Sequence, residues 1–297
     1  MATPNWSIAQ YRMPGEMRVR AGILMDGSVR ALPAGWPLVA VDIFDDWERW
    51  STQLRDLDVH SLPLVIGAEL AAPITFPRKV LCAGANFYDH AAEMGTATPD
   101  PAAPPFFFLK PPTTTVVGPF DDVRVPDLAH AGLDWEIELA AVIGRRARDV
   151  APDEAPGVVA GYTVSNDLSA RARFPRPSAV QAPFAWDWLG HKALDDSCPL
   201  GPGVVPAWMI DDPQELAMRL SVDGVIKQDS STSDMVVPVA RLISAASRWV
   251  TLEPGDVVLT GTPAGVGMPR QDFLGDGARV RAEIEGIGAI ENKIVGV

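Results

Sequence analysis

Prolines occur throughout this sequence, and their spacing limits the length of any regular element. There are 28 prolines among 297 residues, roughly twice the average share. Because they are scattered rather than consecutive, they indicate breaks between many short elements and not a disordered tract. From residue 78 onward, short runs rich in valine, isoleucine, threonine and aromatic residues alternate with turn residues, as in a series of short strands.

One helix is expected to interrupt these strands. It should begin with Pro238 in its first turn, and its apolar stripe should pack on the sheet. The stripe consists of Val239, Leu242, Ile243, Ala246 and Trp249. Strands and helices do not alternate regularly, so a doubly wound sheet or an eightfold barrel is disfavoured. The predicted fold class is therefore mainly β with some α (α+β), with mostly antiparallel or mixed sheets.

A break in periodicity divides the chain in two. Residues 71–77 (AAPITFP) fit no regular period, so we predict a small α/β N-terminal domain over 1–72 and a larger domain over 78–297. Within the first, residues 17–24 alternate as a strand and Asp26-Gly27 is a hairpin turn pair. Residues 42–57 show a helical pattern.

Charge and cysteine content narrow the range of partners. The 38 acidic residues outnumber the 25 basic ones and give a net charge of −13. Such a surplus disfavours nucleic acids and anionic membranes, so we expect a small-molecule partner. Two cysteines, Cys82 and Cys198, cannot build a disulfide framework. With no secretory pattern and no apolar run of about 20 residues, a cytoplasmic protein is expected.

Two glutamates lie in the otherwise apolar segment 133–144 (LDWEIELAAVIG). Read as a strand, this segment places Glu136 and Glu138 on one face and the large apolar residues on the other. Two neighbouring carboxylates are costly there unless a cation compensates them. On spacing alone, both a metal site and a solvated face with arginine partners such as Arg145 or Arg146 remain open.

A third carboxylate belongs to Asp167, which ends the strand-like segment 161–167 (GYTVSND). An aspartate at a strand end is usually a cap or a turn former. Placed beside the two glutamates, however, it would complete three oxygen ligands and leave positions for water and substrate. Such a set suits Mg²⁺ or Mn²⁺ better than zinc.

An ordered series of motifs runs from residue 79 to residue 297. The motifs are AGANFYDHAAEMG, FFFLKPPTTTVVGP, DWEIELAAVIG, GYTVSNDLSAR, HKALDDSCPLGP, LSVDGVIKQDSSTSDM, LEPGDVVLTGTPAGVG and EIEGIGAIENKIV. This ordered series resembles the fumarylacetoacetate hydrolase family. The resemblance implies a mixed β-sandwich roll, preceded by a small N-terminal domain as in many bacterial members. It also implies homodimers or larger assemblies and a divalent metal, Mg²⁺ or Mn²⁺, which Ca²⁺ can replace in a crystal.

The same resemblance implies roles for individual residues. Glu136, Glu138 and Asp167 match the family's metal carboxylates. His90 and Glu93 match a water-activating dyad on a short lid helix, and Lys192 matches a lysine that contacts substrate oxygens.

The spacing of the dyad is consistent with this role. Residues i and i+3 share a helix face, so Glu93 could fix the tautomer of His90, although the same spacing is common on surface helices. Gly84 and Gly95 flank the segment and would let it hinge.

The substrate-binding positions are less complete. Thr262 matches a threonine that holds a carboxylate or carbonyl group, and Lys110 matches a position that orders the site. The family commonly has a glutamine seven residues beyond the aspartate, where this chain has Phe174. Either Gln181 supplies an amide from a reshaped loop, or the pocket is more apolar. The remaining histidines, His60, His130 and His191, are expected to be at the surface or structural.

The leading functional hypothesis is metal-dependent hydrolysis of a carbon–carbon bond next to a carbonyl in a dicarbonyl or acylpyruvate-type acid, within aromatic catabolism. One alternative is decarboxylation of an acid like oxaloacetate, or enol–keto isomerisation of a 2-oxo acid, because both use the same enolate without an attacking water. Another is a non-catalytic relative that binds a metal or a ligand. Retention of His90, Glu93 and Lys192 argues against the last, because a binding module needs no general base.

Overall fold

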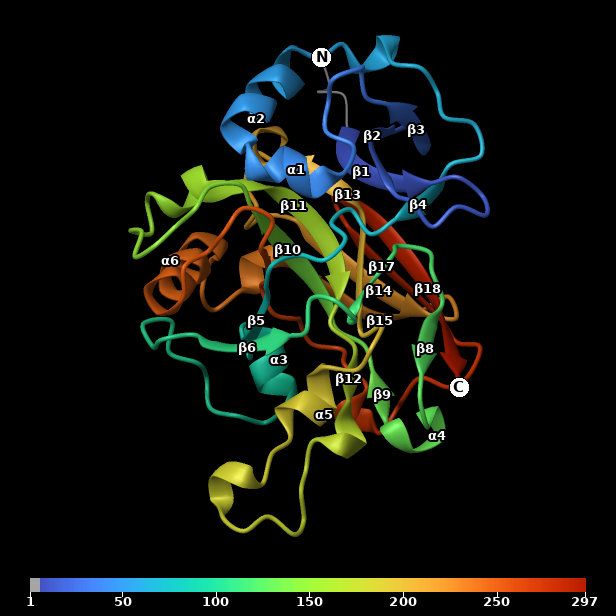
Figure 1. Ribbon diagram of the computed structural model, residues 1–297. Coiled ribbons are helices and arrows are strands. Elements are labelled where there is room, and N and C mark those ends of the chain that lie inside the picture. Colours follow the sequence, from blue (N-terminus) through green and yellow to red (C-terminus); the bar gives the residue numbers. More distant parts are fainter. Residues whose placement is uncertain (1–5) are drawn as a thin grey trace.

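The computed structural model describes residues 6–297, so the first five residues of the predicted N-terminal domain lie outside it. Mixed sheets with few helices dominate, as predicted (Figure 1). The helices are α1 (Ala40–Asp45), α2 (Trp47–Asp56), α3 (Tyr88–Glu93), α4 (Leu128–Ala131), α5 (Trp188–Lys192) and α6 (Val239–Trp249). Single 3₁₀ turns are η1 (Val59–Ser61), η2 (Ala155–Val158), η3 (Arg171–Arg173), η4 (Ala182–Phe184), η5 (Ala207–Met209), η6 (Thr232–Asp234) and η7 (Met268–Arg270).

The larger sheet has 11 strands in the order β3-β2-β1-β13-β11-β10-β16-β5-β6, with β4 paired to β1 and β7 paired to β13. Most neighbours are antiparallel, but β16 with β5 and β13 with β7 are parallel. Its strands are β1 (Trp6–Arg12), β2 (Arg20–Met25), β3 (Ser28–Ala31), β4 (Glu69–Ala71), β5 (Val80–Gly84), β6 (Phe106–Lys110), β7 (Val116–Val117), β10 (Ile137–Ile143), β11 (Val159–Asn166), β13 (Cys198–Pro206) and β16 (Val257–Leu259).

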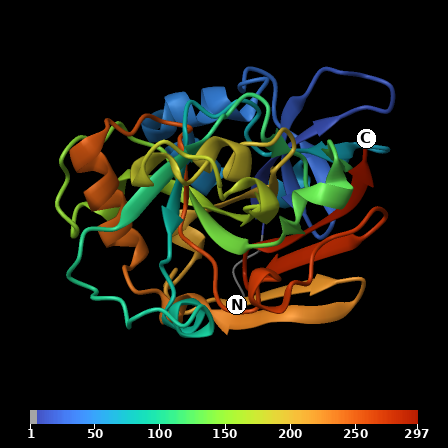
Figure 2. The same ribbon diagram turned by 90° about the horizontal axis from the view of Figure 1, so that it is seen from below.

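A second sheet of five strands follows the order β15-β14-β17-β18-β8. Its strands are β8 (Val123–Val125), β14 (Ala217–Val222), β15 (Val225–Ser231), β17 (Arg279–Ile284) and β18 (Gly288–Gly296). A short pair, β9 (Leu133–Asp134) and β12 (Ser169–Ala170), lies near α4 and α5 (Figure 1). Seen from below, the second sheet in orange and red lies on the opposite side of the molecule from the blue N-terminal helices (Figure 2).

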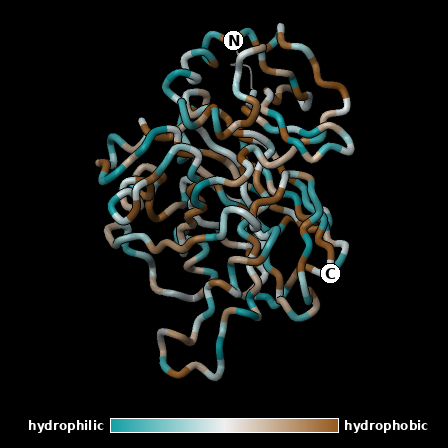
Figure 3. The backbone as a smooth tube through the Cα atoms, in the orientation of Figure 1, coloured by the Kyte–Doolittle hydropathy of each residue, from teal (hydrophilic) through white to brown (hydrophobic). Residues whose placement is uncertain are grey.

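Strand β10 lies between two apolar cores, and its alternation assigns each side chain to one of them. Ile137, Leu139 and Ala141 join the core that includes the second sheet. Ala140 and Val142 face the core formed with the N-terminal helices. The predicted segregation of the apolar residues is confirmed. Hydrophobic and hydrophilic segments are interspersed along the chain (Figure 3).

The N-terminal strands extend the larger sheet, because β1 pairs antiparallel with β13 at Ile8 and Val204. The predicted hairpin is confirmed. Asp26 and Gly27 have φ of 50° and 71° and connect β2 to β3, as a two-residue turn requires. The single helix predicted over 42–57 is instead two helices, because Asp46 leaves the helical region at φ −121° and ψ 52°. The domain division at 72–78 stays a prediction.

The helix predicted to have Pro238 in its first turn is α6, and Pro238 is its N-cap, one position before the first helical residue. Val239, Leu242, Ile243 and Ala246 are buried, as expected. Trp249 does not pack on the sheet and is 72 % exposed. It is the last helical residue, and the chain becomes extended at Val250, so the apolar stripe ends one turn earlier. Among the described residues, no helix is long and apolar enough to span a bilayer.

Candidate metal centre

Three carboxylates meet where β11 ends beside the beginning of β10. Glu136, Glu138 and Asp167 are buried, and each offers an oxygen within 4.8 Å of the others. The antiparallel register pairs Ile137 with Asn166. The backbone N–H of Asp167 donates to the carbonyl of Glu136 at 2.8 Å. Local strand pairing therefore brings together residues that are about 30 positions apart in the sequence.

Three basic side chains contact this triad. Lys192 Nζ lies 2.7 Å from both Glu136 Oε2 and Asp167 Oδ2. Lys110 Nζ lies 2.5 Å from Asp167 Oδ1. Arg171 donates to Glu136 Oε1 at 2.6 Å and to the buried Asp134 at 2.8 Å.

The alternative interpretation, in which Arg145 or Arg146 pairs with the two glutamates on a solvated face, was wrong. Arg145 and Arg146 are exposed, and Arg146 pairs with Glu253 at 3.2 Å. Sequence reasoning assigned no role to Arg171, although it follows Asp167 by only four residues. Its position becomes evident only once β9 and β12 are paired and bring Asp134 beside it.

The charges of this cluster do not balance. Four carboxylates, of Asp134, Glu136, Glu138 and Asp167, face three cations. Within the described residues, Glu138 has no cationic partner in hydrogen-bond contact; it accepts from the backbone N–H of Gly261 at 2.5 Å. Burial, together with the charges of Asp167 and Glu136, raises the pKa of Glu138 well above its usual value.

Glu136 behaves in the opposite way. Burial tends to raise its pKa, but the charges of Lys192 and Arg171 outweigh burial and hold the pKa of Glu136 below its usual range. The deficit of positive charge is therefore localised at Glu138. An added cation would compensate it, and three carboxylate oxygens are the donors that hard divalent cations prefer. The donor set thus fits the predicted divalent metal.

The predicted lid residues lie on α3. His90 and Glu93 share one face, but His90 Nδ1 is 3.5 Å from Glu93 Oε2 and forms no hydrogen bond among the described residues. The carboxylate of Glu93 instead accepts from the backbone N–H of Gly265 at 2.9 Å and from Arg270 at 2.8 Å. His90 is close enough for its charge to contribute to lowering the pKa of Glu136, after burial and the nearer cations.

Buried hydrogen bonds attach the α3 segment to the body. The amide of Asn86 donates to the carbonyls of Val237 and Thr260 at 3.0 and 2.8 Å, and it accepts from the N–H of Val237. A Cβ at Gly84 would lie 2.9 Å from the ring of Phe106, so close packing favours glycine there. Gly95 ends the segment at φ +67°.

Thr262 is buried beside the triad, and its hydroxyl accepts from the Gln228 amide at 2.8 Å. Gln228 also accepts from the N–H of Ile137 at 3.0 Å, so it ties the Thr262 loop to the beginning of β10. No sequence signal marked Gln228, which is simply one residue of strand β15.

Phe174 and Gln181, the two candidates for the altered substrate-binding position, lie in different surroundings. Phe174 stacks on the His191 ring with 4.5 Å between ring centroids. Gln181 is exposed next to η4, on the loop that projects below the body in Figure 1. His60 and His130 are exposed, whereas His191 is buried. Burial, aided by Lys192 and Arg171, lowers the pKa of His191 to about 4.

Comparison with known proteins agrees with this geometry. Residues 79–295 match the model for the fumarylacetoacetate (FAA) hydrolase C-terminal domain. The mitochondrial oxaloacetate tautomerase fahd2 of Xenopus laevis is 42 % identical over 228 residues, covering 76 % of this chain and 68 % of that protein.

Solved structures extend the likeness to the whole fold. The fumarylacetoacetate hydrolase of Exiguobacterium antarcticum has a TM-score of 0.80 at 32 % identity, covering 98 % of this chain and 100 % of that chain. The maleylpyruvate hydrolase of Sphingobium sp. SYK-6, in complex with manganese(II) and pyruvate, has a TM-score of 0.75 at 27 % identity, covering 98 % and 99 %. The relatives are thus enzymes that include a tautomerase and hydrolases. Because the family model matches most of its length, the chain belongs to the fumarylacetoacetate hydrolase family.

Proposed function

We propose that this protein is a divalent-metal-dependent enzyme that interconverts the enol and keto forms of a 2-oxo acid. The observation that carries the proposal is the buried triad of Glu136, Glu138 and Asp167, with the Lys110 and Lys192 ammonium groups in contact. Relatives that are about two-fifths identical and act as oxaloacetate tautomerases support the same reaction class. We propose Mg²⁺ or Mn²⁺ as the metal, the latter being present in the maleylpyruvate hydrolase neighbour.

Each part of the site has a chemical task in this reaction. A divalent cation held by the triad would polarise the substrate's oxygens and favour the enolate. Lys192 and Lys110 keep fixed positive charge beside the triad, in a region where negative charge develops on the substrate's oxygen.

His90 is the candidate base. Enolisation breaks a C–H bond at carbon 3 and forms an O–H bond on the oxygen of carbon 2. It therefore needs a base that takes the proton from carbon and a proton returned to the oxygen, and it needs no attacking water. The Nδ1 atom of His90 is buried beside Glu93, with no hydrogen bond among residues 6–297. The imidazole lies close enough to the triad for its charge to lower the pKa of Glu136, and this proximity makes His90 the candidate base.

A second candidate is the hydrolysis of a carbon–carbon bond, with release of a 2-oxo acid. The positions of His90 and Glu93 on one face of α3 favour it, as does the maleylpyruvate hydrolase neighbour. Hydrolysis, however, requires Glu93 to orient His90 for attack by water. In this structure Glu93 is held by Gly265 and Arg270, and its Oε2 lies 3.5 Å from His90 Nδ1. Because relatives at about two-fifths identity are oxaloacetate tautomerases, we rank tautomerisation first.

The two reactions can be separated with purified protein and added Mg²⁺ or Mn²⁺. We expect the ultraviolet absorbance of enol-oxaloacetate to decay faster than its spontaneous rate, without release of CO₂, and acylpyruvates to remain intact. Glu138→Gln should abolish the acceleration, whereas Glu283→Gln, at an exposed position of β17, should preserve it. Cleavage of acylpyruvates without faster enol decay would replace the tautomerase proposal by the hydrolase one.

A further inference from the structure

Strand β6 carries an aromatic extension of the candidate site. Alternate residues of a strand point to the same face, so Phe106, Phe108 and Lys110 lie in one row. Lys110 ends this row at the triad, where its ammonium group contacts Asp167. Phe108 and Phe106 continue the row away from the triad, at about 7 Å for each pair of residues.

Helix α5 repeats this arrangement from the other side. Trp188 and Lys192 are four residues apart and share one helix face. Lys192 contacts Glu136 and Asp167, and its Nζ lies 5.2 Å from the centre of the Phe108 ring. The Trp188 ring lies 5.2 Å from Phe108 and 5.1 Å from Phe106, so the two elements contribute to one surface.

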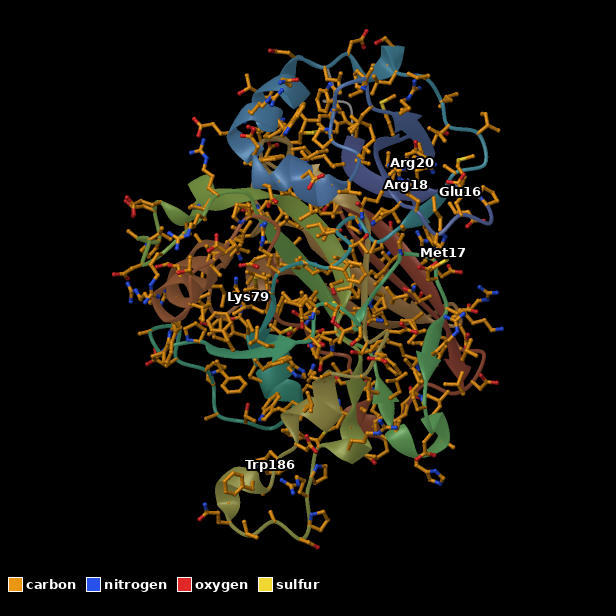
Figure 4. All side chains as sticks on the ribbon, viewed as in Figure 1. Glu16, Met17, Arg18, Arg20, Lys79 and Trp186 are labelled. Carbon is orange, nitrogen blue, oxygen red and sulfur yellow. The ribbon has the colours of Figure 1, made fainter. Side chains whose placement is uncertain are left out.

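The projecting loop contributes two further rings. The rings of Phe174 and Trp188 are 4.9 Å apart, and the same separation joins Phe174 to Trp186. The base of the loop is closed by a bridge between Pro175 and Trp186, and Figure 4 labels Trp186 where the loop leaves the body. We call Phe106, Phe108, Phe174, Trp186 and Trp188 the aromatic row.

The rings of this row are accessible to a ligand, and the cations beside the triad are already paired. Phe106 is 51 % and Trp188 is 39 % exposed, so ring surface is open to a ligand. Lys192 is bound to Glu136 and Asp167, and Arg171 is bound to Glu136 and Asp134, so both of these cations are paired with carboxylates. Arg173 and Arg176 donate instead to backbone carbonyls, those of Pro126 and Phe184. His191 stacks on Phe174 as a neutral imidazole, donating from Nδ1 to the Ala170 carbonyl.

We propose that the aromatic row binds the end of the substrate remote from the carboxylate triad, and that this end is a planar, apolar group. The substrate class is then a 2-oxo acid with an aromatic substituent rather than a second carboxylate. This inference rests on the proposed function, because it takes the 2-oxo acid group to lie at the triad. A ring gains stacking contacts on such a surface, whereas a carboxylate placed against the rings loses hydration.

Binding and turnover of two 2-oxo acids test the proposal. Phenylpyruvate carries a ring where oxaloacetate carries a carboxylate, and both have enol and keto forms. With the Mg²⁺-loaded protein, calorimetry should give a dissociation constant about tenfold lower for phenylpyruvate. Trp188→Ala should weaken phenylpyruvate binding about tenfold and change oxaloacetate binding less than twofold, and Trp188→Phe should restore most of the loss.

Two further variants complete the design. Phe120→Ala removes an exposed ring away from the row and should leave both dissociation constants unchanged. If Trp188→Ala does not fold, Phe106→Ala serves instead, because its ring is half exposed.

Each outcome bears on one of the two proposals. Equal or tighter binding of oxaloacetate, absence of phenylpyruvate binding, or equal weakening of both ligands by the variant overturns the aromatic-end proposal. Tighter binding of phenylpyruvate than of oxaloacetate, lost in Trp188→Ala, supports the aromatic-end proposal at any rate of tautomerisation. Failure to accelerate the tautomerisation of either acid overturns the proposed function and leaves the binding comparison valid.

Discussion

At the scale of single residues, Glu138 differs from its two neighbours in the triad. Glu136 and Asp167 each contact ammonium or guanidinium groups, whereas Glu138 contacts a backbone N–H. A buried carboxylate without a cation is unfavourable when ionised. Glu138 is therefore the residue whose charge most depends on a bound cation.

Glu138→Gln should raise the thermal stability of the metal-free protein, by more at pH 8 than at pH 5. Because the folded-state pKa of Glu138 is raised above its unfolded value, the stabilisation from its protonated form is present at low pH and is lost as pH rises through the folded pKa. Glutamine stays neutral and avoids this loss. Differential scanning calorimetry at the two pH values measures the effect, and a larger gain at pH 5 would contradict it.

Addition of Mg²⁺ should reverse the order of stability. The cation stabilises the wild-type protein by binding its folded state, and Glu138→Gln should bind it much more weakly. Exposed Glu283→Gln is the control, and its melting temperature should rise with Mg²⁺ as in the wild type. An equal rise in Glu138→Gln would show that the triad does not hold the metal.

Gly261→Ala should destabilise the protein and also displace the backbone N–H that donates to Glu138. Gly261 has φ of +96°, and a Cβ there would lie 2.8 Å from the Asn86 Cβ. We expect the free energy of unfolding to fall by about 1–3 kcal/mol, measured by urea denaturation. Gly157→Ala, where a Cβ meets nothing within 4 Å, is the matched control and should change stability little.

At the scale of elements, α3 depends on the body for its position. It has six residues, too few for a helix to be stable alone. Asn86 precedes it and makes three buried hydrogen bonds, while Glu93 near its other end binds Gly265 and Arg270. The family resemblance implied a short helix with His90 and Glu93 on it, but nothing local indicated which loop would bind Glu93.

Asn86→Ala should therefore loosen this end of the site. It leaves the carbonyls of Val237 and Thr260 and one N–H without a partner, at a cost of about 1–3 kcal/mol in the free energy of unfolding. Hydrogen exchange should accelerate across α3 more than across α6. Gln271→Ala removes an exposed amide with a single hydrogen bond and is the control. Unchanged exchange in α3 would show that Asn86 does not hold it.

At the scale of the whole molecule, strand β6 ends the larger sheet. Leu109, on the face of this strand opposite to Phe106 and Phe108, is 58 % exposed, and Trp249 nearby is 72 % exposed. An exposed apolar sheet edge favours association. We propose that the protein is a homodimer, for which light scattering should give about twice 31.8 kDa. A monomeric mass at micromolar concentration would refute it.

The sequence by itself determined the features that depend on short-range periodicity. Alternation in 133–144 placed Glu136 and Glu138 on one face, and the strand-like segment 161–167 placed Asp167 at a strand end. The pairing of β10 with β11 then brought the three carboxylates together. The apolar stripe of α6 and the Asp26-Gly27 turn also depend only on residues close together in the sequence. Neighbouring positions are enough to reveal a period of two or 3.6 residues or a turn pair.

Only the tertiary structure decided which groups surround those carboxylates. Lys110, Arg171 and Lys192 come from a strand, a 3₁₀ turn and a helix that no local pattern connects, and the adjacent arginines 145 and 146 point elsewhere. The same holds for the aromatic row, which joins β6, α5 and a loop. Periodicity fixes the face on which a side chain lies, whereas the neighbours of that face depend on long-range packing.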